Sequence, residues 1–260
     1  MPDSLNLSKS ELVSHALAQM NSDLSERSWT PRQKLALTCR ILFDGGHDSG
    51  LAGQISARAE DKDTYYTQPF GHGFDEITYS NLLLVDLDLK TINGKGMPNP
   101  ANRFHTWIYR ARPNVNCIIH THPVHVSALS MLEVPLQVSH MDTCPLFNDC
   151  AFLEKWPGVP VGNEEGEIIS AALGDKRAIL LSHHGMLVTG KTIEEACLLA
   201  LLMERAARMQ LTAMSAGIIK PIPQDLGEEA HRWITTPKRH AITFDYYARR
   251  ALHRHSDCLD

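Results

Sequence analysis

The chain has 260 residues, of which 43% are hydrophobic, and it carries a formal charge of −5 at pH 7. A chain of this length can bury a large core, and the negative charge gives no basic surplus for nucleic acid. No window approaches the ~18 consecutive apolar residues that a membrane span needs. The 6 cysteines form no CxxC pair, which argues against a thiolate zinc site. We therefore expect a cytoplasmic globular protein that binds neither nucleic acid nor a membrane.

Two helices and several short strands are predicted in the first third of the chain. A capping-box pattern at Ser8 opens a helix that runs to Asp23. Thr30-Pro31 opens a second helix, which stops at Gly45. Alternating or continuous apolar residues between turn signals then predict strands over 54–59, 64–68 and 82–86.

The middle of the chain is predicted to alternate helix and strand. Pro100 precedes an apolar-periodic helix that Pro113 ends, just before the apolar run 116–119. A short helix follows Pro123. The stretch 138–166 is rich in loop signals, and we expect it to line a site because long loops are usually functional.

The last third is predicted to contain two buried strands, a long helix and a tail. The apolar runs 178–181 and 186–188 predict the strands, and a capping box at Thr192 starts a helix that runs to about Ala216. A short terminal helix carrying aromatic residues is expected over 244–250. No repeat or linker divides the chain, so we expect a single domain over 1–260.

Histidines at two predicted strand ends indicate a metal site. Successive side chains alternate along a strand, so His120 and His122 lie on the same face and can bind one ion. Catalytic zinc usually has about three protein ligands and one open position. A third ligand is available in the segment Ser182-His183-His184-Gly185, provided that its strand neighbours the first one. Neutral imidazoles would leave the ion its full charge to polarise a carbonyl or stabilise an enolate.

A phosphate-binding-loop pattern competes with this interpretation. The segment 185–192 fits GxxxxGK[ST] letter for letter and precedes a helix. Its interior residues 186–188 are apolar and β-prone, whereas a phosphate cradle needs an open loop whose amides face the ligand. We therefore predict a strand here and reject a nucleotide site.

With these residues in view, the sequence resembles the class II aldolase/adducin family, and within it the fuculose-phosphate-aldolase-like members, over about 31–216. The remaining 217–260 is then a C-terminal tail. The landmarks of the resemblance are Gly53-Gln54-Ile55-Ser56-Ala57-Arg58, Arg103-Phe104-His105, Tyr109-Arg110-Ala111-Arg112-Pro113, His120-Thr121-His122-Pro123 and His184-Gly185-Met186-Leu187-Val188-Thr189-Gly190.

The resemblance implies a fold, an assembly and a set of metal ligands. It implies an α/β fold, a three-layer α/β/α domain around a central, mainly antiparallel sheet. It also implies a homotetramer with sites at subunit interfaces. His120, His122 and His184 would bind a divalent ion, usually zinc, with iron, manganese or cobalt as alternatives.

Two departures from the family pattern bear on function. Enzymatic members carry a glutamate, the general base, four residues before the histidine of the Phe-His pair; here that residue is Ala101. The glycine loop has Gln54 where sugar-phosphate aldolases have asparagine, which implies a substrate other than a sugar phosphate. The chain is thus a divergent member without the usual catalytic glutamate.

Other side chains are candidates for binding and proton transfer. Tyr246 and Tyr247 resemble the tail tyrosine that family aldolases lend to a site, although packing of a terminal helix accounts for them equally well. Gln54 and Arg103 are candidate substrate-binding residues, with surface ion pairing as the alternative for Arg103. His140 and His183 are candidates for orienting a metal ligand through a hydrogen bond.

The leading hypothesis is a divalent-metal-dependent lyase acting on a small carbonyl or hydroxy-acid compound. Aldol-type cleavage or decarboxylation would leave an enediolate that the ion stabilises. An iron site that activates O₂ is an alternative on the same ligands. A non-catalytic, adducin-like interaction domain with a vestigial metal site is another.

Overall fold

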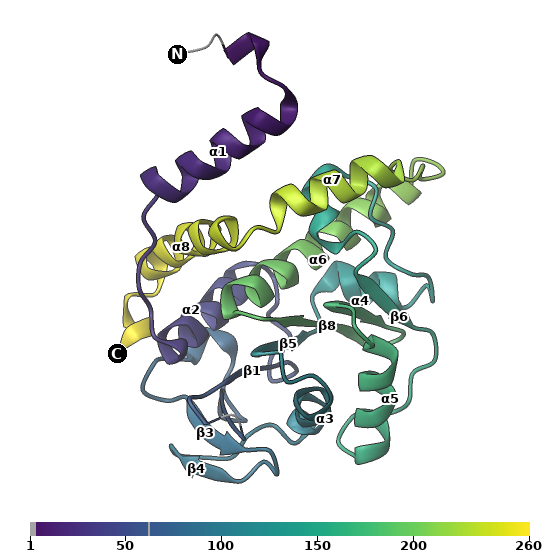
Figure 1. Ribbon diagram of the computed structural model, residues 1–260. Helices are drawn as coiled ribbons and strands as arrows, with labels where there is room; N and C mark the ends of the chain where they lie inside the picture. The colour runs from purple at the N-terminus through teal and green to yellow at the C-terminus, as the bar shows by residue number, and fades with distance from the viewer. Residues whose placement is uncertain (1–3, 62) are drawn as a thin grey trace.

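The computed structural model describes residues 4–61 and 63–260 (Figure 1). An eight-stranded sheet occupies its centre, in the order β4-β3-β2-β1-β5-β8-β7-β6. All neighbours pair antiparallel except β6 and β7, which are parallel. The mainly antiparallel sheet is therefore confirmed. The strands are β1 Gln54–Arg58, β2 Thr64–Thr67, β3 Leu83–Asp86, β4 Thr91–Asn93, β5 Cys117–Thr121, β6 Cys150–Leu153, β7 Ala178–Leu181 and β8 Gly185–Gly190.

Helices cover both faces of this sheet (Figure 1). One core contains Ile119 of β5 together with residues of α2 (Pro31–Asp44), α4 (Val124–Ser130), α6 (Ile193–Met214) and α8 (Pro237–Arg254). The other core contains Ile118 with residues of α3 (Arg103–Ala111) and α5 (Asn163–Leu173). Because neighbouring residues of a strand point to opposite faces, a single run of apolar residues supplies both cores. The three-layer α/β/α arrangement is confirmed.

Three helices are capped at their starts as the sequence predicts. The Ser8 side chain accepts a hydrogen bond from the Glu11 amide at the start of α1 (Lys9–Asp23), and Thr30 does the same for Gln33 at the start of α2. Thr192 caps α6 by accepting from the Glu195 amide. The residues 186–188 lie in β8, so the strand predicted in place of a phosphate-binding loop is confirmed.

Two regions differ from the sequence-based expectation. The stretch 138–166, predicted as a loop, contains the 3-10 helix Met141–Leu146, strand β6 and the start of α5. Strand β6 lies at the sheet edge and is only half-buried, so its hydrophobic signal is weak. The tail forms α7 (Gln224–Ile234) and the 18-residue α8 in place of one short helix. The buried side of α8 includes four residues at helical spacing within a polar sequence: His240, Phe244, Ala248 and Ala251.

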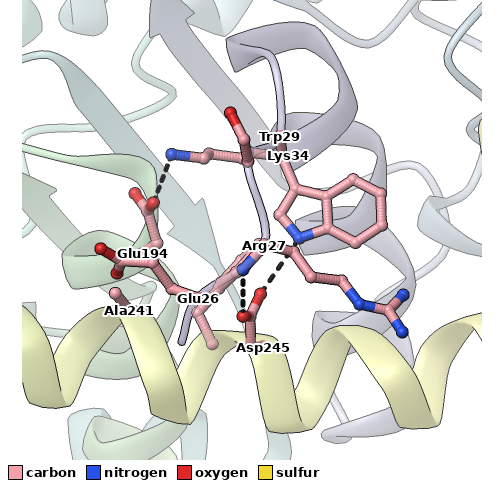
Figure 2. Close-up of a pocket in the computed structure, with 9 residues that line it drawn as sticks. Glu26, Arg27, Trp29, Lys34, Glu194, Ala241 and Asp245 are labelled. Carbon is pink, nitrogen blue, oxygen red and sulfur yellow. Dashed lines mark hydrogen bonds and ion pairs between the residues drawn. The ribbon is translucent and has the colours of Figure 1, made fainter. Parts of the chain in front are cut away.

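The N-terminal arm is joined to the body through a buried carboxylate of α8 and through an ion pair between Lys9 and Glu229 of α7. Helix α1 buries none of its residues, whereas the segment 24–30 after it docks on α8. Asp245, only 5% exposed, accepts hydrogen bonds from the Arg27 amide (2.7 Å) and from Nε1 of Trp29 (3.1 Å), as Figure 2 shows. This side chain therefore anchors the segment around Arg27 and Trp29. None of the described helices combines the length and hydropathy that a membrane span requires.

Replacing Asp245 with alanine is expected to release this arm. Two donors lose their acceptor; the half-buried indole of Trp29 is left without a partner at a cost of about 1–3 kcal/mol, whereas the amide of the exposed Arg27 can bond to water. We expect faster proteolysis within residues 24–30 and a lower free energy of unfolding in urea. Trp29→Phe, which removes only the indole donor, should lie between the wild type and D245A. Equal protease resistance in all three proteins would contradict the assignment.

Candidate metal centre

Three imidazoles meet at the end of the central strands. His120 lies on β5, His122 directly after it, and His184 in the tight turn between β7 and β8. Strands β5 and β8 pair antiparallel, with Thr121 opposite Met186, so the turn that carries His184 lies beside the end of β5. The ring centroids are 4.6 to 4.7 Å apart, and one ligand nitrogen from each ring lies within 4.8 Å of the other two.

A main-chain hydrogen bond fixes the orientation of His120. Its Nδ1 lies 2.8 Å from the carbonyl oxygen of Met186, so Nδ1–H donates and the lone pair is on Nε2. That Nε2 lies 2.8 Å from Nε2 of His122. Two ring nitrogens that face each other this closely require a proton or a cation between them. Three convergent imidazoles with an oriented lone pair fit a divalent ion with an open coordination position.

Burial keeps the three rings ready to bind a metal. It lowers the pKa of His184 to about 4 and also lowers the pKa of His122. The pKa of His120 falls well below its usual range because of burial and, next, because of its two histidine neighbours. At neutral pH all three rings are therefore uncharged, the form that coordinates a metal.

Glycines let the surrounding backbone approach these rings. A Cβ on Gly185 would lie 2.5 Å from Cδ2 of His122 and 2.6 Å from the carbonyl oxygen of Thr121. Gly53 has φ +125°, and a Cβ there would lie 3.3 Å from the carbonyl oxygen of His120. Gln68 holds this second loop, since its amide bonds both the Gly53 carbonyl (2.9 Å) and the Ile55 amide (3.0 Å).

Buried polar groups lie on the same face of the sheet as His120. Gln54 of β1 pairs directly with His120, and its buried Oε1 has no hydrogen-bond partner among the described residues. Ser56, also on this face, bonds both Nδ1 of His105 (2.7 Å) and the hydroxyl of Tyr109 (2.9 Å) on α3. Unpaired buried acceptors are costly, so Gln54 is positioned to receive a donor from a ligand.

The residues just before α3 and at its start also belong to this side of the sheet. Ala101 is 8% exposed and belongs to the core on the α3 side of the sheet. Arg103 is half-buried, and its guanidinium makes no ion pair or hydrogen bond with the residues that the structure describes. An unpaired, partly buried guanidinium is a ready partner for a carboxylate.

The remaining predicted site residues lie apart from the three histidines. His183 has φ +54°, and its Nε2 lies 2.8 Å from Oε1 of Glu133. His140 accepts a hydrogen bond from the Asp142 amide. Tyr246 and Tyr247 lie on α8, which covers the sheet face opposite to the side chain of His120; Tyr246 is 46% exposed and bonds Arg250.

Sequence reasoning missed three supporting groups. Gln68 and the Ser56 hydroxyl reach the site only through strand pairing and the packing of α3, and His47 lies in the loop after α2; no local pattern reveals these contacts. His47 is buried behind β5, where its Nδ1 lies 2.8 Å from the Thr121 hydroxyl.

The burial of His47 predicts a pH dependence of stability. Burial lowers its pKa to about 3 from an ordinary value of about 6.5. Between these two pH values the unfolded chain binds the proton and the folded chain does not. The His47 ring therefore does not lower the free energy of unfolding above about pH 6.5, and it lowers it progressively as the pH falls toward about 3. The free energy of unfolding of metal-free protein should lose about 1.4 kcal/mol per pH unit from this group between pH 6 and 4. In His47→Leu the slope should decrease by that amount, whereas His72→Leu, at an exposed position, should retain the wild-type slope.

Comparison with known proteins agrees with this architecture. Residues 33–211 match the family of the Class II Aldolase and Adducin N-terminal domain. The 4-hydroxy-3-prenylphenylpyruvate oxygenase/4-hydroxy-3-prenylbenzoate synthase of Streptomyces roseochromogenus subsp. oscitans is 34% identical over 78% of this chain and 76% of its own length. The decarboxylase NovR of Streptomyces niveus is 35% identical over 72% of this chain and 69% of its own.

A solved structure shows the same fold over nearly the whole chain. The L-fuculose 1-phosphate aldolase from Glaciozyma antarctica PI12 superposes with a TM-score of 0.81 at 27% identity, covering 94% of this chain and 99% of the other. This structural match covers more of the chain than the family match over residues 33–211, so it includes part of the tail helices. By sequence and by fold, the chain belongs to the class II aldolase and adducin family.

Proposed function

We propose that the protein is a divalent-metal-dependent lyase that breaks the carbon–carbon bond next to a carbonyl in a small carboxylic acid, with decarboxylation favoured over aldol cleavage. The observation that carries this proposal is the combination of three convergent neutral imidazoles with Ala101 where the family base is expected. A divalent ion held there would polarise the substrate carbonyl and stabilise the negative charge left by bond cleavage.

The alanine at residue 101 favours one of the two lyase reactions. Aldol cleavage starts with removal of a hydroxyl proton, which needs a base beside the substrate. Decarboxylation of a 3-oxo acid starts from a carboxylate that is already ionised, and as CO₂ leaves the bond electrons would pass toward the carbonyl oxygen to give an enolate. Only a later proton donor is then required, so the apolar Ala101 is compatible with this reaction.

The chain's own residues can bind the two ends of such a substrate. Arg103 would pair with the carboxylate, and the unpartnered Oε1 of Gln54 would accept a hydrogen bond from a substrate hydroxyl. Tyr246 and Tyr247 lie across the sheet from His120, so we propose that a tyrosine from a neighbouring copy donates the final proton. A homo-oligomer, a tetramer as in the family resemblance, is part of this proposal.

Metal identity separates two enzymatic candidates. Three imidazoles with an open position suit Zn²⁺, our first choice, and also Fe²⁺, which can activate O₂. The second candidate, an iron-dependent oxygenase, is supported by the similarity to the Streptomyces roseochromogenus protein, which is named an oxygenase.

The test combines metal analysis with two gas measurements. Protein purified without added metal is analysed for its metal content, then supplied with a panel of 3-oxo acids, with and without a 2-hydroxyl group, and of 2-oxo acids, while CO₂ release and O₂ uptake are recorded. Zinc with CO₂ release in the absence of O₂ supports the lyase. Iron with stoichiometric O₂ uptake supports the oxygenase, and no turnover with any divalent metal would favour a binding domain.

The substrate-binding assignment of Arg103 has its own expected outcome. Arg103→Met should raise KM for a carboxylate substrate by about 10- to 100-fold, since a charge-assisted hydrogen bond is worth about 1.5–3 kcal/mol. Metal content should not change. Arg103→Lys keeps the charge and should recover part of the loss. A wild-type KM in Arg103→Met would show that the substrate carboxylate binds elsewhere.

A further inference from the structure

Helix α4 connects the segments that carry two of the three converging histidines. It begins two residues after His122. At its other end, the carbonyl oxygen of its last residue, Ser130, accepts a hydrogen bond from the His183 amide (3.2 Å), and His184 is the next residue. This bond joins main chain to main chain, so it does not depend on the His183 ring. One short helix therefore contacts both segments.

The connection between His122 and α4 is stiff. Pro123 is the single residue between His122 and Val124, where α4 begins. A proline ring fixes φ at about −65°, and φ of Pro123 is −68°. A proline also restricts the residue before it to extended backbone, which here is His122. A displacement of the start of α4 is thus passed on to the His122 ring.

A glutamate of the neighbouring helix α6 caps the start of α4. Pro123 at the N-cap position has no side-chain acceptor, and the amides that a cap would normally satisfy belong to His125 and Val126. Oε1 of Glu204 accepts a hydrogen bond from the His125 amide (3.1 Å), and Oε2 accepts one from the Val126 amide (2.9 Å). The Nδ1–H of His125 donates a third bond to Oε1. One carboxylate on α6 therefore holds the first turn of α4.

These hydrogen bonds fix α4 at one position along α6. The Glu204 side chain is only 13% exposed, so water competes little for its acceptors. Val126 and Leu129 of α4 belong to the buried core that includes α6. Apolar contact is non-directional and does not by itself set the position of one helix along another. Removing the carboxylate would leave amides unsatisfied, at about 1–3 kcal/mol each where they are buried.

We propose that Glu204 is a positioning residue for the metal centre and that it acts through α4. The inference rests on the proposed binding of a divalent ion by the three histidines. With Glu204 in place, α4 sets the separation between His122 and His184, so the two rings are already at their ligand positions. Groups that orient metal ligands without touching the ion typically change metal affinity by about 10- to 100-fold. Without this carboxylate, the start of α4 could shift and displace the His122 ring.

The test compares Co²⁺ binding by full-length variants from which metal has first been removed. Glu204→Leu removes all three hydrogen bonds and should bind Co²⁺ at least about tenfold more weakly than the wild type, measured by competition with a chelator. The visible absorption spectrum of bound Co²⁺ depends on coordination geometry and should change as well. Glu204→Gln keeps one acceptor oxygen, so it should recover part of the affinity, and it replaces the leucine variant if that variant does not fold.

Glu195 is the matched control on the same helix. Its side chain is 11% exposed, and it accepts hydrogen bonds from the Lys191 amide (2.6 Å) and from Arg177 (2.7 Å). Lys191 follows β8 and His184 precedes it, so a strand of 6 residues, about 20 Å long, separates this glutamate from the metal centre. Glu195→Leu should also lower the thermal midpoint of the metal-free protein, but it should bind Co²⁺ with the affinity and spectrum of the wild type.

Three results would overturn the inference. Wild-type Co²⁺ affinity and spectrum in both Glu204 variants would show that α4 keeps its position without the carboxylate. Equal losses of affinity in Glu204→Leu and Glu195→Leu would show a general effect of lower stability. A wild-type protein that binds no divalent ion would overturn the proposed metal centre and this inference together, whereas the first two results leave the metal centre standing.

Discussion

His184→Ala is expected to lose its metal and all metal-dependent activity while the fold is retained. Structural zinc sites with four ligands bind with about 10–16 kcal/mol, so one ligand carries about 2.5–4 kcal/mol, or roughly 100- to 1,000-fold in affinity. His184 lies in a turn and is half-exposed, so its removal leaves the two cores intact. Metal content by atomic emission and the far-ultraviolet circular dichroism spectrum check both parts of the expectation.

The adjacent histidine provides a matched control. His183→Ala removes the same ring one residue earlier, but that ring bonds Glu133 and not the other two ligands. It should retain its full metal content. Equal metal loss in both variants would show that the turn, and not the His184 ring, is what the ion requires.

Gly185→Ala is expected to be nearly as damaging, without removing any ligand. The added methyl group would lie 2.5 Å from His122 and 2.6 Å from a main-chain oxygen, and the oxygen cannot move without disturbing β5. Overpacking of this kind costs about 1–3 kcal/mol, and here the displaced ring is a proposed metal ligand. We expect a lower thermal midpoint and at least about tenfold weaker metal binding, measured by competition with a chelator.

Gly217 is a suitable control position, because a Cβ added there would have no atom within 4 Å. Gly217→Ala should leave both the thermal midpoint and metal affinity unchanged. If Gly185→Ala behaved in the same way, the close approach of this glycine to His122 would have no role in the site.

Local sequence signals account for most of the fold. Capping boxes at Ser8 and Thr30 and the apolar run 178–181 predict elements that the structure contains. The missed elements are those whose stability comes from tertiary contacts. The buried side of α8 is a narrow stripe in a polar sequence, and β6 is a half-buried edge strand within a stretch that has turn signals at both ends.

The three converging histidines can be predicted from the sequence, but their surroundings cannot. Alternation along β5 places His120 and His122 on one face, and a strand-flanking His-His-Gly offers a third ring. The choice of His184 over His183 depends on the left-handed backbone at His183, which turns that side chain toward Glu133. Gln68 and Ser56 contribute through strand register and through α3, contacts that span from 13 to 53 residues of sequence.

The His120 ring is oriented by a hydrogen bond to the main-chain carbonyl of Met186. Its orientation therefore does not depend on which side chain residue 186 carries. Any residue at position 186 presents the same oxygen, so ordinary substitution cannot remove the bond; only a slip in the pairing of β5 with β8 can. The proposed ion site is thus tied to the centre of the sheet, while the proposed substrate-facing positions 54, 101 and 103 are free to change.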